Sequence, residues 1–317
     1  MAELPGEGTY VCTLDEETQK KAKDELKEDP KERASKIQAV RDWIKKHPYI
    51  TSRTDDAFIL RFLRLCKSSV LDTQKRIEQF CIKRTTSEGA PEWFASQDVD
   101  DPKIIDILSK PAQIVLPKPK GKKDGPVYIL SLSRNMDPNA DINDMMRALY
   151  MTVDTNVMDE NMQVHGMYFI QDMKGVGMDI MKIWNRENIT KAIKVWKDVY
   201  PTRTKQFHYV NMPRFLNAIM EIIKLFLGKK LSDRMKIHHS EKEFAKKIPK
   251  ECLPNEYGGT AGTIEEIYAP FREKVLNNRQ EYELLKQCWA DEEKMPKEVP
   301  TGDAWGMVGS FRKMETD

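Results

Sequence analysis

This chain of 317 residues has few cysteines, little net charge and no long hydrophobic run. Its five cysteines, Cys12, Cys66, Cys81, Cys252 and Cys288, include no Cys-x-x-Cys pair. An odd number of cysteines without such a pair fits reduced thiols in the cytosol better than a disulfide framework or a zinc site. Lysine and arginine number 52 against 50 aspartates and glutamates. The net charge of +2 therefore indicates neither a nucleic acid nor an acidic substrate as partner.

No segment has the length and composition of a membrane span. The longest apolar segment, residues 215–227, is interrupted by Asn217, Glu221 and Lys224. It is also shorter than the about 20 apolar residues that a helix needs to cross a bilayer. The first residues lack a basic segment followed by an apolar one, so we expect no signal peptide. We predict a cytoplasmic protein whose association with membranes is transient and peripheral.

The signatures of common enzyme classes are missing as well. The sequence KGVG at 174–177 follows a predicted strand, but Ile180 stands where a dinucleotide-binding loop has its third glycine. The chain contains no phosphate-binding GxxxxGK(S/T) loop and no HExxH or GxSxG motif. We therefore expect a protein that is not an enzyme, with no catalytic residues, no cofactor and no metal site.

Hydrophobic periodicity divides the chain into a helical part and an α/β part. Residues 15–84 have helical spacing, with Thr54 or Asp55 as the N-cap of a strongly apolar helix. After Pro91, short β-rich runs alternate with longer helical ones, which is typical of an α/β domain with a mixed, mostly parallel sheet flanked by helices. We expect strands at 113–116, 127–132, 167–171, 207–210 and 236–238, and helices at 143–162, 179–199, 213–227 and 263–289.

These elements predict three parts of the chain. Residues 1–90 are expected to form an N-terminal helical module, and residues 91–267 the α/β domain. Residues 268–317 are expected to contain a C-terminal helix and a tail with proline and glycine.

The distribution of methionine favours an adaptable cavity. Ten of the 17 methionines lie between Met136 and Met181. Methionine is flexible and polarizable, so a cluster of it suits a cavity that must adjust to an irregular apolar ligand. Ordinary core packing is the alternative.

The helix predicted at 213–227 has apolar residues on most of its circumference. Only Asn217, Glu221 and Lys224 form a narrow polar strip, so the helix needs apolar neighbours on two sides. It is either a buried central helix or a gate, with one face over a cavity and another for a bilayer.

Positive charge is concentrated beside this helix. Residues 203–250 hold twelve lysines and arginines against four acidic residues, a local formal charge of +8. Such a surface suits anionic lipid headgroups, because each basic residue near an anionic membrane contributes about 1 kcal/mol. A solvated surface is the alternative, and nucleic acid is a weaker one because no binding module is present.

Several segments together resemble the CRAL-TRIO lipid-binding proteins, within the branch of α-tocopherol transfer protein and cellular retinaldehyde-binding protein. They are DDAFILRFLR at 55–64, GPVYILSLSR at 125–134, HGMYFIQDMKG at 165–175, DVYPTRTKQFHYVNMPRFLN at 198–217 and LPNEYGG at 253–259. The ending WGMVGSFRKMETD at 305–317 resembles the tails of insect members.

The resemblance implies a hydrophobic pocket between the sheet and helices, closed by a mobile gate over 211–234. It implies these ligand-binding residues: Met146, Leu149, Tyr150, Val153, Gln171, Ala192, Val195, Trp196, Tyr200, Phe207, Phe215, Ile219 and Ile223. Gln171 stands where the tocopherol branch carries an aromatic residue. Its amide would bind either a ligand hydroxyl or carbonyl, or a neighbouring backbone group or Tyr150, because a buried polar group needs a partner.

The resemblance also implies a phosphoinositide-docking cluster of Arg203, Lys205, Lys230 and Arg234, with Lys75 as a helper. We expect an intracellular carrier that exchanges one small hydrophobe, such as a tocopherol, retinoid or carotenoid, with phosphoinositide-containing membranes. A phosphatidylinositol exchange protein is the alternative within the fold, but that type usually has an acidic residue where Thr202 stands. A trafficking adaptor that binds a protein partner through its termini is the alternative from another class.

Overall fold

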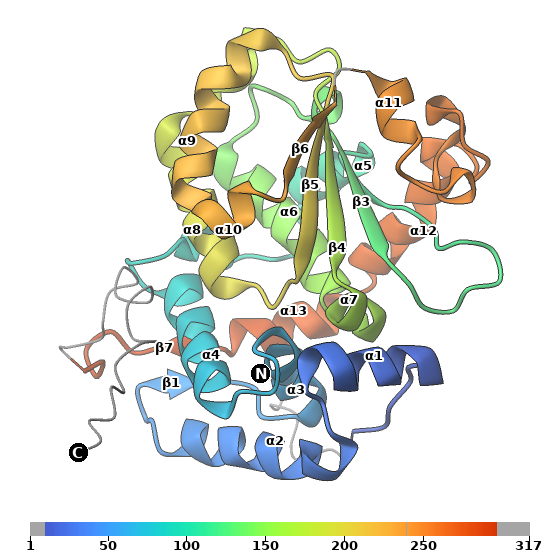
Figure 1. The fold of residues 1–317 in the computed structure, drawn as a ribbon. Coiled ribbons are helices and arrows are strands. Elements are labelled where there is room, and N and C mark those ends of the chain that lie inside the picture. Colours follow the sequence, from blue (N-terminus) through green and yellow to red (C-terminus); the bar gives the residue numbers. More distant parts are fainter. Residues whose placement is uncertain (1–9, 239, 297–317) are drawn as a thin grey trace, which may run out of the picture.

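A computed structural model describes residues 10–238 and 240–296, and it places a group of helices beneath a sheet that is itself flanked by helices (Figure 1). Among the described residues, no helix has both the length and the apolar character that crossing a membrane requires. All five cysteines are free thiols.

The helical module contains α1 (Glu16–Leu26), α2 (Pro30–Lys45), α3 (Asp56–Leu65) and α4 (Val70–Thr85). A short polar side chain accepts a backbone hydrogen bond at the start of each helix, namely Asp15, Asp29, Asp55 and Ser69. The helical run predicted from residue 15 is therefore two helices, because Lys27 ends α1 in a left-handed conformation and Pro30 begins α2.

The predicted mixed sheet is confirmed. Its strands are β2 (Gln113–Val115), β3 (Val127–Leu132), β4 (Met167–Asp172), β5 (Thr204–Val210) and β6 (Met235–His238), hydrogen-bonded in that order. Only β2 runs antiparallel to its neighbour, and the other pairs are parallel. Parallel neighbours need crossover connections, and helices supply them here.

The crossover helices are α6 (Ile142–Asn156), α7 (Glu160–His165), α8 (Arg186–Val199), α9 (Asn217–Leu227) and α10 (Lys229–Ser232). The helix predicted over 143–162 is broken because Asp159 caps a new helix, α7. Similarly, Asn185 caps α8, so Met178–Lys182 is a separate 3-10 turn. A further 3-10 turn, Arg214–Leu216, precedes α9.

The remaining helices are α5 (Pro102–Ser109), α11 (Glu241–Ala245), α12 (Ile264–Leu276) and α13 (Arg279–Lys286). In Figure 1, α11 and α12 lie on one side of the sheet, and α8 and α9 lie on the other. The terminal helix predicted over 263–289 is two helices, which are separated at Asn277 and Asn278. Strand β7 (Trp289–Ala290) pairs with β1 (Ile50–Thr51) and ties this segment to the helical module. The domain boundaries at 90 and 267 stay a prediction.

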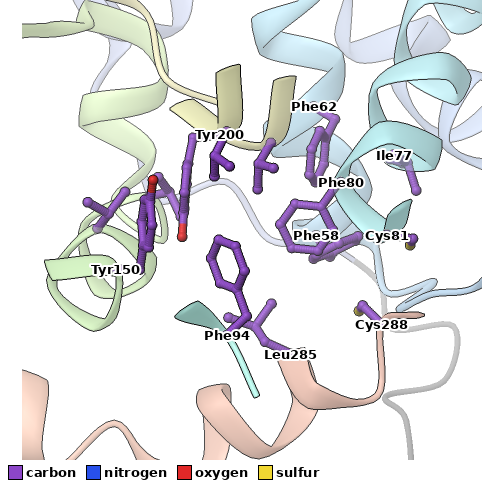
Figure 2. Packing of buried hydrophobic residues seen from close by; sticks show 14 of the residues in the cluster. Phe58, Phe62, Ile77, Phe80, Cys81, Phe94, Tyr150, Tyr200, Leu285 and Cys288 are labelled. Carbon is purple, nitrogen blue, oxygen red and sulfur yellow. The ribbon is translucent and has the colours of Figure 1, made fainter. Parts of the chain in front are cut away.

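One hydrophobic core joins the module to the sheet domain. Phe58, Phe62 and Phe80 pack together with ring centroids 5.1–5.6 Å apart. Figure 2 shows the core continuing to Tyr150 and Tyr200, whose rings stack at 5.1 Å. These large buried rings fix α6 and α8 against α4, and so hold the walls of the cavity described next.

Candidate functional site

A cavity of about 270 Å³ lies between one face of the sheet and helices α6, α8 and α9. Its sheet floor includes Phe169, Gln171, Phe207 and Tyr209. Its walls include Met146, Leu149 and Tyr150 of α6, Ile189, Ala192, Ile193 and Trp196 of α8, and Ile180, Met181 and Trp184 between β4 and α8. No charged side chain of the described residues lines it. The space suits a neutral apolar molecule.

Helical periodicity explains two of its walls. The α8 lining residues are spaced i, i+3, i+4 and i+7, which places them on one face. Leu216, Ile219, Met220, Ile223 and Leu227 repeat the same spacing and face the cavity from α9 and the turn before it. Helix α9 therefore closes the cavity opposite the sheet.

The outer side of this closing segment, residues 214–227, also carries apolar side chains. Phe215 is 36% exposed and Leu225 is 76% exposed, whereas Ile219 and Ile223 line the cavity. Successive residues of a helix are about 100° apart, so Leu225 lies on the face opposite to Ile223 and Ile219. The closing segment is thus apolar toward the cavity, and toward the outside it presents Phe215 and Leu225 beside the charged Glu221 and Lys224.

Nine of the thirteen expected ligand-binding residues line the cavity: Met146, Leu149, Tyr150, Gln171, Ala192, Trp196, Phe207, Ile219 and Ile223. Val153, Val195 and Tyr200 do not line it, and all three are buried in the core that joins the module to the domain. Val195 is one residue, or about 100°, away from Trp196 on α8. Phe215 points outward. The structure places these four residues outside the cavity lining, and ligand binding by all thirteen residues stays a prediction.

Sequence reasoning missed several lining residues on the strands and turns. They include Gln113, Ser131, Ser133, Met136, Met173, Trp184 and Tyr209. The methionine cluster indicated some of the lining, because four of its members face the cavity: Met136, Met146, Met173 and Met181. Met158 and Met178 are exposed instead, and other members of the cluster belong to the core.

Gln171 makes its hydrogen bond within the cavity. Its amide nitrogen donates to Ser133 Oγ at 2.6 Å, and the Ser133 hydroxyl donates to Met173 Sδ at 3.1 Å. Its partner is therefore Ser133 and not Tyr150. A smaller hollow of about 80 Å³ adjoins the cavity and shares Gln113, Leu149 and Trp184 with it.

The expected phosphoinositide cluster lies around the start of β5. Arg203 and Lys205 flank Thr204, whose carbonyl accepts a hydrogen bond from Arg234. Lys230 belongs to α10, but its side chain lies outside the described part of the chain, and Lys75 lies on α4. The structure thus brings three of the five basic residues together, and phosphoinositide binding stays a prediction.

A carboxylate of the helical module already occupies this basic cluster. Glu25 Oε2 on α1 lies 3.0 Å from the Arg203 guanidinium and 3.3 Å from Lys205 Nζ, while its other oxygen lies 2.6 Å from Lys21 Nζ. The Lys21 hydrogen bond, followed by Arg203 and Lys205, lowers the pKa of Glu25 to about 2 against the opposing effect of burial. Burial lowers the pKa of Lys205, and the neighbouring Arg203 charge lowers it further. Glu25 is therefore ionised at neutral pH.

Two domain families match the chain. The CRAL/TRIO domain matches residues 113–259, and the Pinta-like UBA domain matches residues 29–104. The mouse (Mus musculus) protein named alpha-tocopherol transfer protein-like is 34% identical over 81% of this chain and 74% of its own length. Clavesin-1 of Xenopus laevis is 31% identical over 78% of this chain and 74% of its own length.

A solved structure is similar in fold. The crystal structure of Sfh5 has a TM-score of 0.51 at 13% identity and covers 85% of this chain and 99% of Sfh5. At this identity the likeness shows the fold alone. The insect branch expected from the tail is not confirmed, and residues 305–317 lie outside the described residues.

Proposed function

We propose that this chain, which belongs to the CRAL/TRIO domain family, is an intracellular carrier that holds one small hydrophobic ligand and exchanges it with membranes. One observation carries the proposal. The cavity between the sheet and α9 has an uncharged, mostly apolar lining, and the segment that closes it also exposes the apolar side chains of Phe215 and Leu225 on its outer side. A helix of this kind can shield the ligand in water and contact lipid when the cavity opens.

We infer a tocopherol, retinoid or carotenoid-like ligand. Flat and branched hydrocarbon skeletons fit a cavity lined by aromatic, branched and methionine side chains, because these surfaces exclude water and adapt to irregular shapes. The name of the mouse relative, which refers to alpha-tocopherol transfer, supports the same class.

The proposed transfer cycle starts at the basic cluster. Arg203, Lys205 and Arg234, with Lys230 on the neighbouring helix, would bind the phosphates of a phosphoinositide in place of Glu25. The outer side chains of the closing segment, Phe215 and Leu225, would then enter the bilayer. Opening of α9 would release or admit the ligand, and no covalent bond would form or break.

Lipid extraction and transfer test this function directly. The full chain, purified from a eukaryotic host, is exposed to vesicles carrying tocopherols, retinoids, carotenoids, sterols and phosphatidylinositol, and bound lipid is identified by native mass spectrometry. We expect one neutral hydrophobe per chain. Phosphatidylinositol alone would indicate an exchange protein despite Thr202, and a chain that binds none of these lipids would contradict the carrier.

Charge reversal tests the docking step separately. The test variant carries glutamate in place of four basic residues, Arg203, Lys205, Lys230 and Arg234. It should lose transfer to phosphoinositide vesicles and retain the bound ligand. The matched control reverses four lysines that are exposed on other surfaces and should leave transfer unchanged; they are Lys31, Lys120, Lys122 and Lys274. Equal transfer by both variants would reject the docking cluster.

A protein-binding adaptor is the second candidate, and the match of residues 29–104 to a UBA domain favours it. Deletion of residues 1–30 or 300–317 separates the two functions. Loss of a protein partner with unchanged lipid extraction would favour the adaptor, because the cavity residues lie outside both deletions.

A further inference from the structure

The floor of the cavity contains one row of polar side chains. The strand register aligns Gln113 of β2 with Ser131 of β3, Ser131 with Gln171 of β4, and Gln171 with Tyr209 of β5. All four residues line the cavity. Because neighbouring strands lie about 4.8 Å apart, the row extends over about 14 Å of the floor.

The adjacent row on the same face is apolar. Ile129, Phe169 and Phe207 are aligned two residues earlier on the three parallel strands, and the two phenylalanines line the cavity. Side chains two residues apart on a strand share a face, so both rows point into the same space. The floor is therefore polar toward the carboxyl ends of these strands and apolar toward their amino ends.

The polar row retains hydrogen-bonding capacity. The Gln113 side-chain carbonyl accepts from the Thr152 hydroxyl at 2.5 Å, and the Gln171 amide donates to Ser133. Within the described residues, the Gln171 side-chain carbonyl and the hydroxyls of Ser131 and Tyr209 form no hydrogen bond with protein. Covering such groups with hydrocarbon costs free energy, whereas a ligand oxygen would satisfy them.

We infer that the cavity selects neutral hydrophobes that carry a hydroxyl or carbonyl oxygen, and that it holds this oxygen over the row of Ser131, Gln171 and Tyr209. The hydrocarbon body then lies over Phe169 and Phe207, beneath α9. A hydroxyl is the best match, because it donates to the Gln171 carbonyl and accepts from a tyrosine or serine hydroxyl. This inference rests on the proposed carrier function and narrows its ligand class.

The same geometry disfavours two related classes of ligand. A pure hydrocarbon would cover the polar row without satisfying it. An ionised carboxylic acid would enter a cavity that has no cationic side chain among its described lining residues to compensate the charge. The order of affinity should therefore be alcohol first, with the hydrocarbon and the acid both weaker.

Three probes with one C20 skeleton test this order: phytanol, phytane and phytanic acid. Their binding to the full chain is measured at pH 7.5 by competition and native mass spectrometry, with retinol and retinoic acid as a second pair. We expect phytanol to bind about 10-fold more tightly than phytane or phytanic acid, the effect of one or two neutral hydrogen bonds.

Two near-isosteric variants identify the groups responsible. Gln171→Leu and Tyr209→Phe should each lower phytanol affinity about 3- to 10-fold and leave phytane affinity unchanged or higher. The control Met146→Leu changes the wall without changing polarity, so it should affect all three probes alike. Thermal unfolding shows that each variant is folded.

The outcomes separate this inference from the carrier function. Equal affinity for phytanol and phytane, or a loss shared equally by both probes in Gln171→Leu and Tyr209→Phe, would overturn the inference while a carrier remains. If the chain binds neither these probes nor any lipid of the vesicle panel, the carrier proposal fails and this inference fails with it.

Discussion

The helical module and the ligand cavity have opposite kinds of interior. The module and its contacts contain buried ion pairs, whereas the cavity has no charged lining residue in the described chain. Arg64 pairs with Glu28 at 2.8 Å and Glu160 at 3.1 Å, and Arg84 pairs with Asp154 at 3.3 Å. The module is thus joined to α6 and α7 through charges that fit only in fixed positions.

This difference indicates which part of the chain must keep its shape and which part must adapt. A buried charge needs its partner at a set distance and angle, so it resists displacement. Methionine and aliphatic side chains repack at small cost, so they accommodate ligands of different outline. The module therefore holds α6 and α8 in place, and we propose that α9 and the methionine side chains of the lining adjust to the ligand.

The largest effect is expected from breaking a buried ion pair. Arg84 and Asp154 have side chains only 2% exposed, and Gln97 hydrogen-bonds to both. Arg84→Met leaves a buried carboxylate without its cation, so the free energy of unfolding should fall by about 3–5 kcal/mol. Chemical denaturation at pH 7 measures this change.

The pH dependence of this variant has a definite sign. Burial raises the pKa of Asp154, and the Arg84 charge opposes that rise. Without Arg84 the pKa of Asp154 in the folded chain rises further, so above about pH 4 the folded chain binds more protons than the unfolded chain. The free energy of unfolding of the variant therefore falls as the pH rises. The destabilisation should therefore be larger at pH 7 than at pH 5. Arg279→Met breaks an exposed pair with Asp100 and should leave the free energy of unfolding nearly unchanged. An equal loss of stability in Arg84→Met and Arg279→Met would contradict the special role given to the buried ion pairs.

A smaller effect is expected at the outer face of the closing segment. Phe215→Asp combined with Leu225→Asp removes two apolar side chains from the surface that is proposed to enter the bilayer. Vesicle affinity should fall about 100-fold, which corresponds to about 3 kcal/mol for two side chains. Vesicle sedimentation measures this loss, and the free energy of unfolding should change by less than about 0.5 kcal/mol.

The matched control for the gate uses exposed apolar residues elsewhere. Val11 and Ile105 are 76% and 38% exposed, close to the values for Leu225 and Phe215. Val11→Asp combined with Ile105→Asp adds the same charge and should preserve vesicle binding. If this control lost as much affinity as the gate variant, the effect would come from net charge and not from insertion.

The resemblance gave more of the lining residues on the helical walls than of those on the floor. The lining residues of α8 and α9 follow a helical period, which is visible within one segment. The polar row depends on how Gln113, Ser131, Gln171 and Tyr209 align across four strands, and one sequence does not contain that register. The Arg84–Asp154 pair is likewise invisible, because the fold brings together residues 70 positions apart.

Filling space should have opposite consequences in the two interiors. Ala90 is completely buried in the core, so Ala90→Phe should destabilise the chain by about 1–3 kcal/mol. Ala192 lines the cavity, so Ala192→Phe should leave the free energy of unfolding unchanged or raise it while lowering the amount of bound lipid. Ala192→Ser, which adds little volume, should retain the lipid. An equal loss of stability in both phenylalanine variants would show that the cavity is packed as tightly as the core.

The smallest effect is expected at Glu25, where α1 of the module contacts the start of β5. Glu25→Gln removes the carboxylate that pairs with Arg203 and Lys205, so affinity for phosphoinositide vesicles should rise about 5-fold, or about 1 kcal/mol. Vesicle titration measures the rise, which should shrink at high salt because ions screen the lipid charges.

The pKa of Glu25 predicts how this contact responds to acid. The folded-state pKa of Glu25 is about 2, and its unfolded-state pKa is about 4.3. Its ion pairs therefore stabilise the folded chain fully above about pH 4.3, and this stabilisation is lost as the pH falls through about 2. The affinity ratio of Glu25→Gln to the natural chain should therefore be constant between pH 5 and 8. Glu17→Gln changes the same charge at an exposed position of α1 and should not raise the affinity. An equal rise in both variants would mean that net charge, and not release of Arg203 and Lys205, controls docking.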